Sequence, residues 1–388
     1  MVEQFRLEVR SWLEANCPPS MRTPVVEDEV VMGGKAERFK NPEAKIWFDR
    51  MVAKGWTAPQ WPKIYGGAGL TPAEALVLRE EMSRLNCRRP LFSFGYWMLG
   101  PVLLQYGTEE QKLEHLPKIA RGEVRWCQGY SEPEAGSDLA SLRTRAVLQG
   151  DQFIINGSKI WTSIAQESDW IFCLVRTDPD AIKQKGISFV LIDMSDPGVK
   201  VEPILLISGA SPFCEVFFKD VRTPAKNLVG PLNGGWQIAK ALLTHERLNI
   251  DEMGDRGEEQ SLEDRLRHAV GTVDGKLADR GLRDRLAAYH MDNQAFRMTM
   301  ECDTALQKAG HAPGAASSVF KWYGSELGKR KFELLMEGLG NDSLVWDGHG
   351  APEDNQATRD WLRSKGYSIE GGTSEIQLNI IAKQVLGL

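Results

Sequence analysis

The sequence has no long apolar run, because no stretch approaches the roughly 18 apolar residues that a membrane-spanning helix needs. Histidine and cysteine are scarce, at six residues each, and they form neither a CxxC pair nor a metal-ligand spacing. Scattered cysteines favour buried or free thiols over disulfides, and we expect no metal site. The N-terminal segment MVEQFRLEVRSWLEAN also lacks an apolar signal core and a transit-peptide character. We therefore expect a cytoplasmic protein without a membrane span.

An excess of positive charge is missing as well. The formal net charge is -6, which favours solubility and argues against nucleic acid as a partner, since nucleic acid needs a basic face. Hydrophobic residues make up 42% of the chain and charged residues 26%, as in ordinary globular proteins. A length of 388 residues exceeds the size at which a single core usually keeps growing, so two or three packed units are expected.

The apolar periodicity changes twice along the chain. It is helical in the first third, for example after the Thr71-Pro72 start signal, and it alternates in the middle third. Gly150-Asp151 gives a two-residue hairpin signal between two alternating runs. The helical period returns at Gly234, with polar interruptions at 251–280 and 346–360. The expected fold is a multidomain α+β protein with domains at 1–122, 123–231 and 232–388. Strands are expected at 144–148, 152–155, 170–176, 187–193, 199–205 and 214–218.

Two breaker-rich segments of the middle domain carry candidate ligand chemistry. The first is Ser131-Glu-Pro-Glu-Ala-Gly-Ser-Asp138, in which Gly136 lets the backbone approach a ligand closely. Its backbone N–H groups and the hydroxyls of Ser131 and Ser137 suit flavin carbonyls and a phosphate. The second is Gly157-Ser-Lys-Ile-Trp-Thr-Ser163, whose tryptophan would cover one face of an isoalloxazine ring. Each segment alone is equally compatible with a polar hairpin around a core tryptophan.

Together these segments resemble the acyl-CoA dehydrogenase family. The first matches the pattern (Ser/Thr)-Glu-x-x-(Ala/Gly)-Gly-Ser-Asp, and the second matches Gly-x-Lys-x-Trp. Three further segments follow the family's pattern in the family's order: Trp56 to Gly69, Glu215-Val-Phe-Phe-Lys-Asp-Val-Arg-Thr-Pro, and Gly371-Gly-Thr-Ser-Glu-Ile-Gln. The resemblance implies an N-terminal α-helical domain, a β-barrel-like middle domain and a C-terminal four-helix bundle. It also implies FAD, bound between the last two domains and an adjacent subunit.

The resemblance assigns cofactor contacts residue by residue. Tyr130 and Ser131 would meet the pyrimidine side of the flavin, and Ser137 a cofactor phosphate or the CoA side. Trp161 would lie against the flavin, and Ser163 would take the N5-contacting place that threonine usually holds. The full set of expected cofactor-binding residues is Tyr130, Ser131, Gly136, Ser137, Trp161, Ser163, Thr373 and Glu375.

The implied reaction removes a proton from Cα and a hydride from Cβ of an acyl-CoA, so it needs a carboxylate base. Many family members place this glutamate just before the Gly-Thr of the last motif, where this sequence has Gly371. Glu370 precedes this position by one residue, so we do not assign it the role of the base. The isovaleryl- and long-chain-type members carry the base on the first helix of the C-terminal domain, where this sequence has Glu246. Arg247, beside it, resembles an arginine that supports the active-site geometry.

The residues around Glu246 argue in the same direction. Ala239, Leu242, Leu243 and Ile250 form an apolar stripe at helical spacing, with Glu246 in its middle. A carboxylate in a buried stripe has a raised pKa and accepts a proton better near neutral pH. A core glutamate paired with an arginine is the structural alternative.

The sequence also departs from the family. The usual Arg-x-x-Phe-Gly element, which reaches a neighbour's FAD, is missing, and Arg283 or Arg285 is the available substitute. This departure resembles bacterial steroid-degrading members that form heterotetramers of two unlike chains. The expected partners are an acyl-CoA, an electron-transfer flavoprotein, and either identical subunits or a related chain. A catalytically silent partner subunit and an oxygen-using acyl-CoA oxidase are the alternatives, and the acyl chain is left open.

Overall fold

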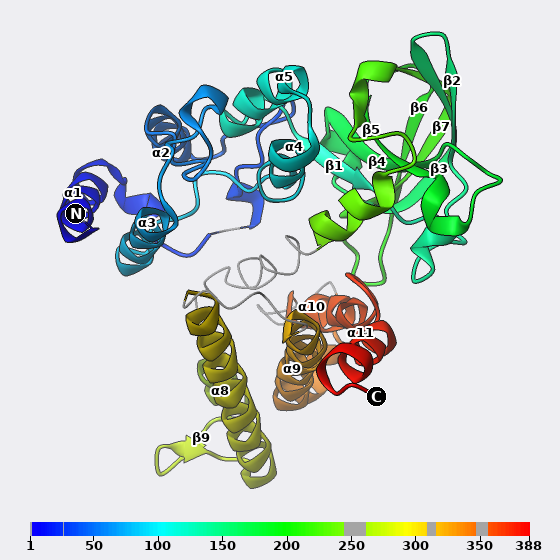
Figure 1. Ribbon diagram of the computed structural model, residues 1–388. Coiled ribbons are helices and arrows are strands. Elements are labelled where there is room, and N and C mark those ends of the chain that lie inside the picture. Colours follow the sequence, from blue (N-terminus) through cyan, green and yellow to red (C-terminus); the bar gives the residue numbers. More distant parts are fainter. Residues whose placement is uncertain (1, 26, 244–260, 309–315, 347–355) are drawn as a thin grey trace. The chain divides into compact units, whose positions relative to one another are not determined.

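The computed structural model describes residues 2–25, 27–243, 261–308, 316–346 and 356–388 (Figure 1). They pack into two compact units. The first spans Met1–Ile204 with Pro212–Gly257, and the second spans Leu205–Ser211 with Glu258–Leu388. Among the described residues, no helix is long and apolar enough to cross a membrane.

The N-terminal part of the first unit is helical, as the sequence predicted. Two helices begin with a capping box: Thr71 and Glu74 satisfy each other's backbone N–H groups, as do Thr108 and Gln111. A π-helical turn, Gly95–Leu99, leads into the fourth helix. The helices are α1 (Val2–Asn16), α2 (Pro42–Ala53), α3 (Pro72–Arg84), α4 (Gly100–Tyr106) and α5 (Glu109–Ala120).

A single buried carboxylate ties α1 to α3. Glu81 of α3 is 2% exposed and accepts hydrogen bonds from Arg10 at 2.9 Å, Arg6 at 3.1 Å and Arg84 at 2.7 Å. The bonds from Arg10, together with those from Arg84 and Arg6, outweigh burial and lower the pKa of Glu81 to about 2. This carboxylate is therefore charged across the physiological range and holds the two helices together.

Replacing Glu81 by glutamine is expected to lower the free energy of unfolding by roughly 2 kcal/mol at pH 7. The folded pKa lies below the unfolded value near 4.3, so the unfolded state binds more protons between the two values. The stability that the charged Glu81 adds to the wild-type protein is therefore fully present above about pH 5, and it declines as the pH falls towards 2. Thermal unfolding of both proteins between pH 3 and 7 measures this difference.

Glu80→Gln is the matched control, because Glu80 is 44% exposed and makes a surface bond of 2.7 Å to Arg6. It is expected to change stability by less than about 1 kcal/mol. Equal effects of the two substitutions, or a pH-independent effect of Glu81→Gln, would contradict the argument.

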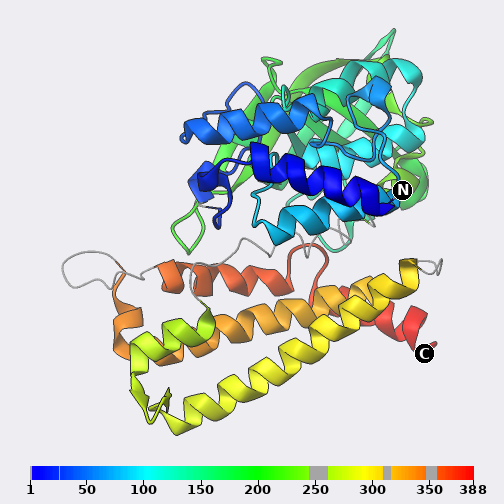
Figure 2. The ribbon, with the colours of Figure 1, turned by 90° about the vertical axis from the view of Figure 1, so that its left-hand side faces the viewer.

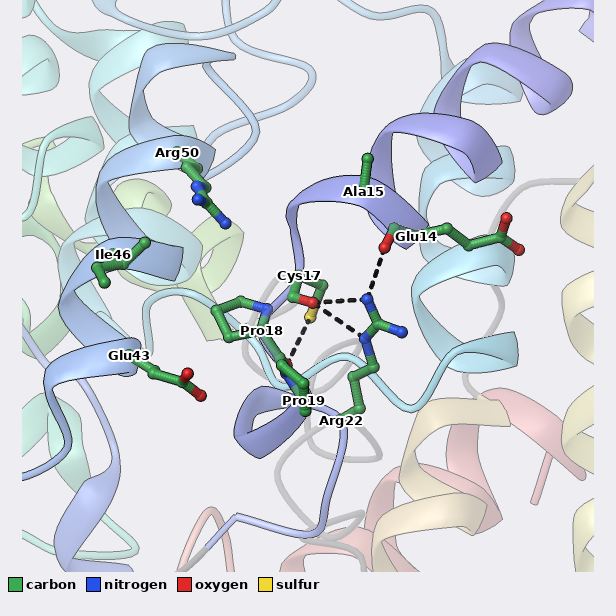
Figure 3. A pocket seen from close by; sticks show the side chains of 9 residues that line it. All are labelled: Glu14, Ala15, Cys17, Pro18, Pro19, Arg22, Glu43, Ile46 and Arg50. Carbon is green, nitrogen blue, oxygen red and sulfur yellow. Dashed lines mark hydrogen bonds between the residues drawn. The ribbon is translucent and has the colours of Figure 1, made fainter.

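The end of α1 is closed by arginine side chains (Figure 3). Arg22 donates to the carbonyl oxygens of Glu14 at 2.7 Å and Cys17 at 2.6 Å, and Arg50 donates to that of Asn16. These carbonyls are the ones that the end of a helix leaves without an intrahelical partner. The hollow around them has a volume of about 370 Å³. Its arginines therefore have a structural role.

The rest of the first unit is built on a mixed eight-stranded sheet with strand order β6-β7-β3-β2-β4-β5-β8 and β1 paired in parallel with β4. Within the described residues no pairing joins β6 to β8, so the sheet is open and not a closed barrel. The expected hairpin at Gly150-Asp151 is confirmed, with Gln149 opposite Gln152. The strands are β1 (Trp126–Gly129), β2 (Arg145–Gln149), β3 (Gln152–Ser163), β4 (Trp170–Arg176), β5 (Ile187–Asp193), β6 (Val199–Ile204), β7 (Phe213–Pro224) and β8 (Leu228–Val229).

Both faces of β4 and β5 are buried, which explains the continuous apolar runs of these two strands. On β4, Phe172 and Leu174 join a core that includes residues of α4 and α5. The alternate residues Ile171 and Cys173 join a second core on the other face. All six cysteines lie in described segments and are free thiols.

The second unit is helical (Figure 2). Among the described residues, helix α9 packs against α7, α8, α10 and α11. A core that contains Leu266, Leu286 and Leu335 lies where α7, α8 and α9 meet. The polar stretch 251–280 contains a helix, because Leu262 and Leu266 give it one buried face. The elements are α7 (Leu262–Val270), β9 (Thr272–Val273), β10 (Lys276–Leu277), α8 (Arg280–Lys308), α9 (Ala316–Leu339), α10 (Gln356–Ser364) and α11 (Ser374–Ile380).

Candidate functional site

The two motif segments of the middle domain lie side by side. The first segment begins directly after β1, and the second forms the end of β3. The amide of Ile160 donates to the carbonyl of Ser131 at 2.9 Å, and the Lys159 ammonium donates to the carbonyl of Tyr130 at 3.1 Å. The two motif segments, about 30 positions apart in the sequence, are therefore joined by direct hydrogen bonds.

A buried ion pair joins the two segments. The Lys159 Nζ lies 2.6 Å from Glu132 Oε1, with the lysine side chain 0% and the glutamate side chain 8% exposed. The Glu132 carboxylate also accepts from the amides of Arg143 at 2.6 Å and Thr144 at 2.9 Å. Burial alone would raise the pKa of Glu132, but the Lys159 charge and these hydrogen bonds lower it. Sequence reasoning missed both residues, although each is a defining letter of its motif.

Trp161 stands out from β3 in a strained conformation. A bulge interrupts the β3–β7 register between Lys159 and Thr162, and Trp161 adopts a left-handed φ of +62°. Its side chain is 54% exposed, and its ring lies edge-on to Phe213, at 6.2 Å between centroids. A bulky residue with positive φ is costly and is characteristic of functional sites. Ser163 follows at the end of β3, partly exposed.

The loop after Ser131 leaves room for a ligand. A Cβ added at Gly136 would have no atom within 4 Å. Ser137 is exposed, and Asp138 at the end of the loop is held by Lys183 at 2.7 Å. The backbone of this loop is thus accessible at the glycine and the serine that the sequence singled out.

The Tyr130 ring is buried, and its main-chain carbonyl is bound to Lys159. The ring is 5% exposed and packs edge-on against Phe172 and Phe189, at 6.3 and 6.5 Å between centroids. The side chain therefore belongs to the core. The four expected contacts Tyr130, Ser131, Trp161 and Ser163 come from segments that adjoin one another.

Thr373 and Glu375, the two other expected cofactor contacts, lie in the second unit at the start of α11. The Thr373 hydroxyl caps α11 by accepting from the amide of Ile376 at 3.3 Å, and Glu375 stands exposed in the first turn. Hydrogen bonds from its own backbone amide and from Thr373 lower the pKa of Glu375. The start of α11 thus has one side chain committed to capping and one charged side chain in solvent.

Gly371 has a φ of +60°, a conformation in which a side chain is disfavoured. The neighbouring Glu370 is bound to Arg363 at 2.7 Å. This pairing gives Glu370 a structural role in the second unit.

The predicted base follows, in the sequence, a helical segment that the structure describes. Residues 235–243 are helical, and Ala239 and Leu242 are 1% and 0% exposed, as the apolar stripe requires. Glu246, Arg247 and Ile250 lie outside the described residues.

The start of this helix is tightly anchored to β5. The Ser188 hydroxyl accepts from the amide of Asn233 at 2.8 Å. A Cβ at Gly235 would lie 2.5 Å from the Ser188 carbonyl carbon. Only a glycine allows the helix to begin this close to the strand.

The two arginines expected to replace the missing motif arginine are both engaged within the second unit. Arg285 is paired with Glu337, and Arg283 donates to the carbonyl of Leu277 at 3.5 Å. Sequence reasoning had no means of finding these partners, because they depend on how α8 packs on α9 and on the β9–β10 hairpin.

The chain matches three family models that together cover nearly its whole length. They are the acyl-CoA dehydrogenase N-terminal domain at residues 2–123, the middle domain at 127–221 and the C-terminal domain at 233–386. The matches follow one another in chain order.

Individual proteins give the same result. The chain is 37% identical over 391 residues to acyl-CoA dehydrogenase IpdE1 of Mycobacterium tuberculosis, covering 100% of this chain and 98% of the relative. A solved structure described as the Tcur3481-Tcur3483 steroid ACAD superposes with a TM-score of 0.78 at 31% identity, covering 100% and 97% of the two chains. The ChsE4-ChsE5 complex from Mycobacterium tuberculosis gives a TM-score of 0.73 at 30% identity, with the same coverage.

Proposed function

The chain belongs to the acyl-CoA dehydrogenase family of oxidoreductases, and from this premise we propose that it converts an acyl-CoA thioester to the trans-2-enoyl-CoA. The observation that carries the proposal is the adjoining pair of motif segments, with Trp161 strained and half-exposed beside Ser131. We retain the division into domains at 1–122, 123–231 and 232–388 as part of this proposal. The cytoplasmic location stays a prediction.

FAD is the proposed cofactor, and when bound it supplies the acceptor for the hydride from Cβ. The open space at Gly136 and the exposed Trp161 ring fit a flat ligand with a phosphate tail. The residues proposed to hold it are Tyr130 by its main chain, Ser131, Gly136, Ser137, Trp161, Ser163, Thr373 and Glu375.

Glu246 is the proposed base and Arg247 its support. The Cα–H bond is only weakly acidic, so the carboxylate must be desolvated and aimed at the proton. Glu246 follows the helical residues 235–243 in the sequence; this segment has its start fixed on β5 and buries Ala239 and Leu242. This anchorage would hold the base in place relative to the substrate.

A steroid-derived acyl group is the proposed substrate class. Its support is the similarity to the structure described as a steroid ACAD, at 31% identity over the whole chain. A ring-bearing acyl chain is also the bulkiest of the substrates that the sequence left open.

A second chain of the same family is the proposed partner, either a copy of this one or a related chain. On α8 the residues Met291, Ala295, Met298 and Cys302 recur at spacings of four, three and four. Met291 is 73% and Met298 54% exposed, so this apolar stripe faces outward in the single chain. The similarity to a chain of the structure described as the ChsE4-ChsE5 complex supports an unlike partner. The flavin content per chain, measured after expression alone and with a related chain, separates the two arrangements.

An electron-transfer flavoprotein is the proposed electron acceptor. Oxygen uptake during turnover would instead identify an oxidase. A chain that binds no flavin alone or with a partner would be the silent structural subunit.

The proposed function is tested by anaerobic titration with a panel of acyl-CoAs, including steroid-derived ones, while the flavin absorbance near its visible maximum is followed. We expect bleaching by a steroid-derived acyl-CoA at about one equivalent per bound flavin. Stable flavin absorbance with every member of the panel would contradict the dehydrogenase assignment.

A further inference from the structure

We propose that the buried pair Lys159–Glu132 is a positioning pair, which holds the Ser131 peptide and the Trp161 bulge in the geometry that receives the flavin. The inference rests on the proposed function and deepens it. Neither residue touches the expected ligand surface directly, since both side chains are buried.

The lysine orients the backbone on one side of Ser131. Its ammonium donates to Glu132 Oε1 at 2.6 Å and also to the carbonyl of Tyr130 at 3.1 Å. In a trans peptide the carbonyl of one residue and the N–H of the next point in opposite directions. Holding the Tyr130 carbonyl towards Lys159 therefore turns the Ser131 N–H away from the lysine.

The second peptide plane of Ser131 is held from the same strand. The Ser131 carbonyl accepts from the amide of Ile160 at 2.9 Å. Both peptide planes next to Ser131 are thus fixed by consecutive residues of β3, so the Ser131 amide has little freedom. A hydrogen-bond donor held in this way meets its acceptor without first losing conformational entropy.

Glu132 connects the Ser131 segment to the start of β2. Its carboxylate accepts from the amides of Arg143 and Thr144, just before β2, and the Thr144 hydroxyl donates to the carbonyl of Ser158 at 3.1 Å. A Cβ at Gly157 would lie 2.7 Å from Thr144, so β3 approaches this point closely. The pair therefore connects the end of β1, the start of β2 and the part of β3 just before the bulge.

The Lys159–Glu132 pair lies next to the bulge that contains Trp161. Lys159 is two residues before Trp161, at the edge of the bulge that gives Trp161 its φ of +62°. A strained conformation persists only where the surroundings hold it. Lys159 is a fully buried residue at the edge of that bulge, at 0% exposure.

A buried ion pair is weak support for stability, because apolar residues of similar size often replace it without loss. The test is therefore the double variant Lys159→Met/Glu132→Met, which removes both charges and keeps the volume. We expect the apoprotein to keep its circular dichroism, with a lower Tm because the Arg143 and Thr144 amides and the Tyr130 carbonyl lose their partners. We expect the Kd for FAD to rise about tenfold or more, and the visible spectrum of bound flavin to shift towards that of free FAD.

Glu132→Gln is the second variant, in case the double variant does not fold, because it keeps the shape and removes only the charge. It is expected to weaken FAD binding in the same direction. Glu81→Gln is the control: it breaks a buried ion cluster among the N-terminal helices and should lower Tm without changing the flavin spectrum or Kd.

A wild-type Kd and an unchanged flavin spectrum in either folded variant would overturn the inference and leave the proposed function intact. Absence of FAD binding by the wild-type chain would instead contradict the proposed cofactor.

Discussion

Replacing Glu246 by glutamine is expected to abolish the bleaching of bound flavin by acyl-CoA under anaerobic conditions, while FAD content and fold are kept. Glutamine has the shape of the glutamate but cannot accept the Cα proton. Removal of a general base costs on the order of 10²–10⁴-fold in rate. Stopped-flow absorbance measures the loss, and circular dichroism with the flavin-to-protein ratio checks that fold and cofactor are unchanged.

Glu370→Gln is the matched control for this substitution. Glu370 lies closest in sequence to the alternative base position, but it is bound to Arg363 at 2.7 Å. We expect it to leave bleaching at the wild-type rate. The opposite pattern, bleaching by Glu246→Gln and none by Glu370→Gln, would move the base to the C-terminal motif.

Replacing Gly235 by alanine is expected to slow bleaching on the order of 10²-fold and to lower the free energy of unfolding by roughly 1–3 kcal/mol. The new Cβ would lie 2.5 Å from the Ser188 carbonyl carbon and 2.7 Å from the Phe189 amide nitrogen. Both atoms belong to the backbone of β5, so the helix start must move instead. Glu246 follows the helical residues 235–243 by three positions in the sequence, so we expect a displaced helix start to displace the base as well.

Gly136→Ala is the control for the effect on stability, since its Cβ would meet no protein atom within 4 Å. It should leave the Tm of the apoprotein unchanged and weaken FAD binding. Thermal unfolding of both apoproteins, and single-turnover bleaching of both holoproteins, measure the contrast. Wild-type stability and rate in Gly235→Ala would show that the helix start tolerates displacement.

Several parts of this fold could be predicted because their causes are local. Alternating apolar residues around Gly150-Asp151 predicted the β2–β3 hairpin, and Thr71-Pro72 predicted the start of α3; both are confirmed. The ordered motifs identified the family, which the three family models confirm. The helical nature of α7 was missed, because its two buried residues, Leu262 and Leu266, stand among charged side chains.

The sequence by itself determined the family and the candidate segments of the site, because motif residues and their spacing are properties of the chain. Only the tertiary structure decided how those segments meet. Lys159 pairs with Glu132, which lies 27 positions earlier in the chain. Gly235 packs against Ser188, which lies 47 positions earlier. The left-handed Trp161 likewise depends on a bulge set by the register of β3 against β7. Contacts of this kind follow from strand register and packing, which no local pattern encodes.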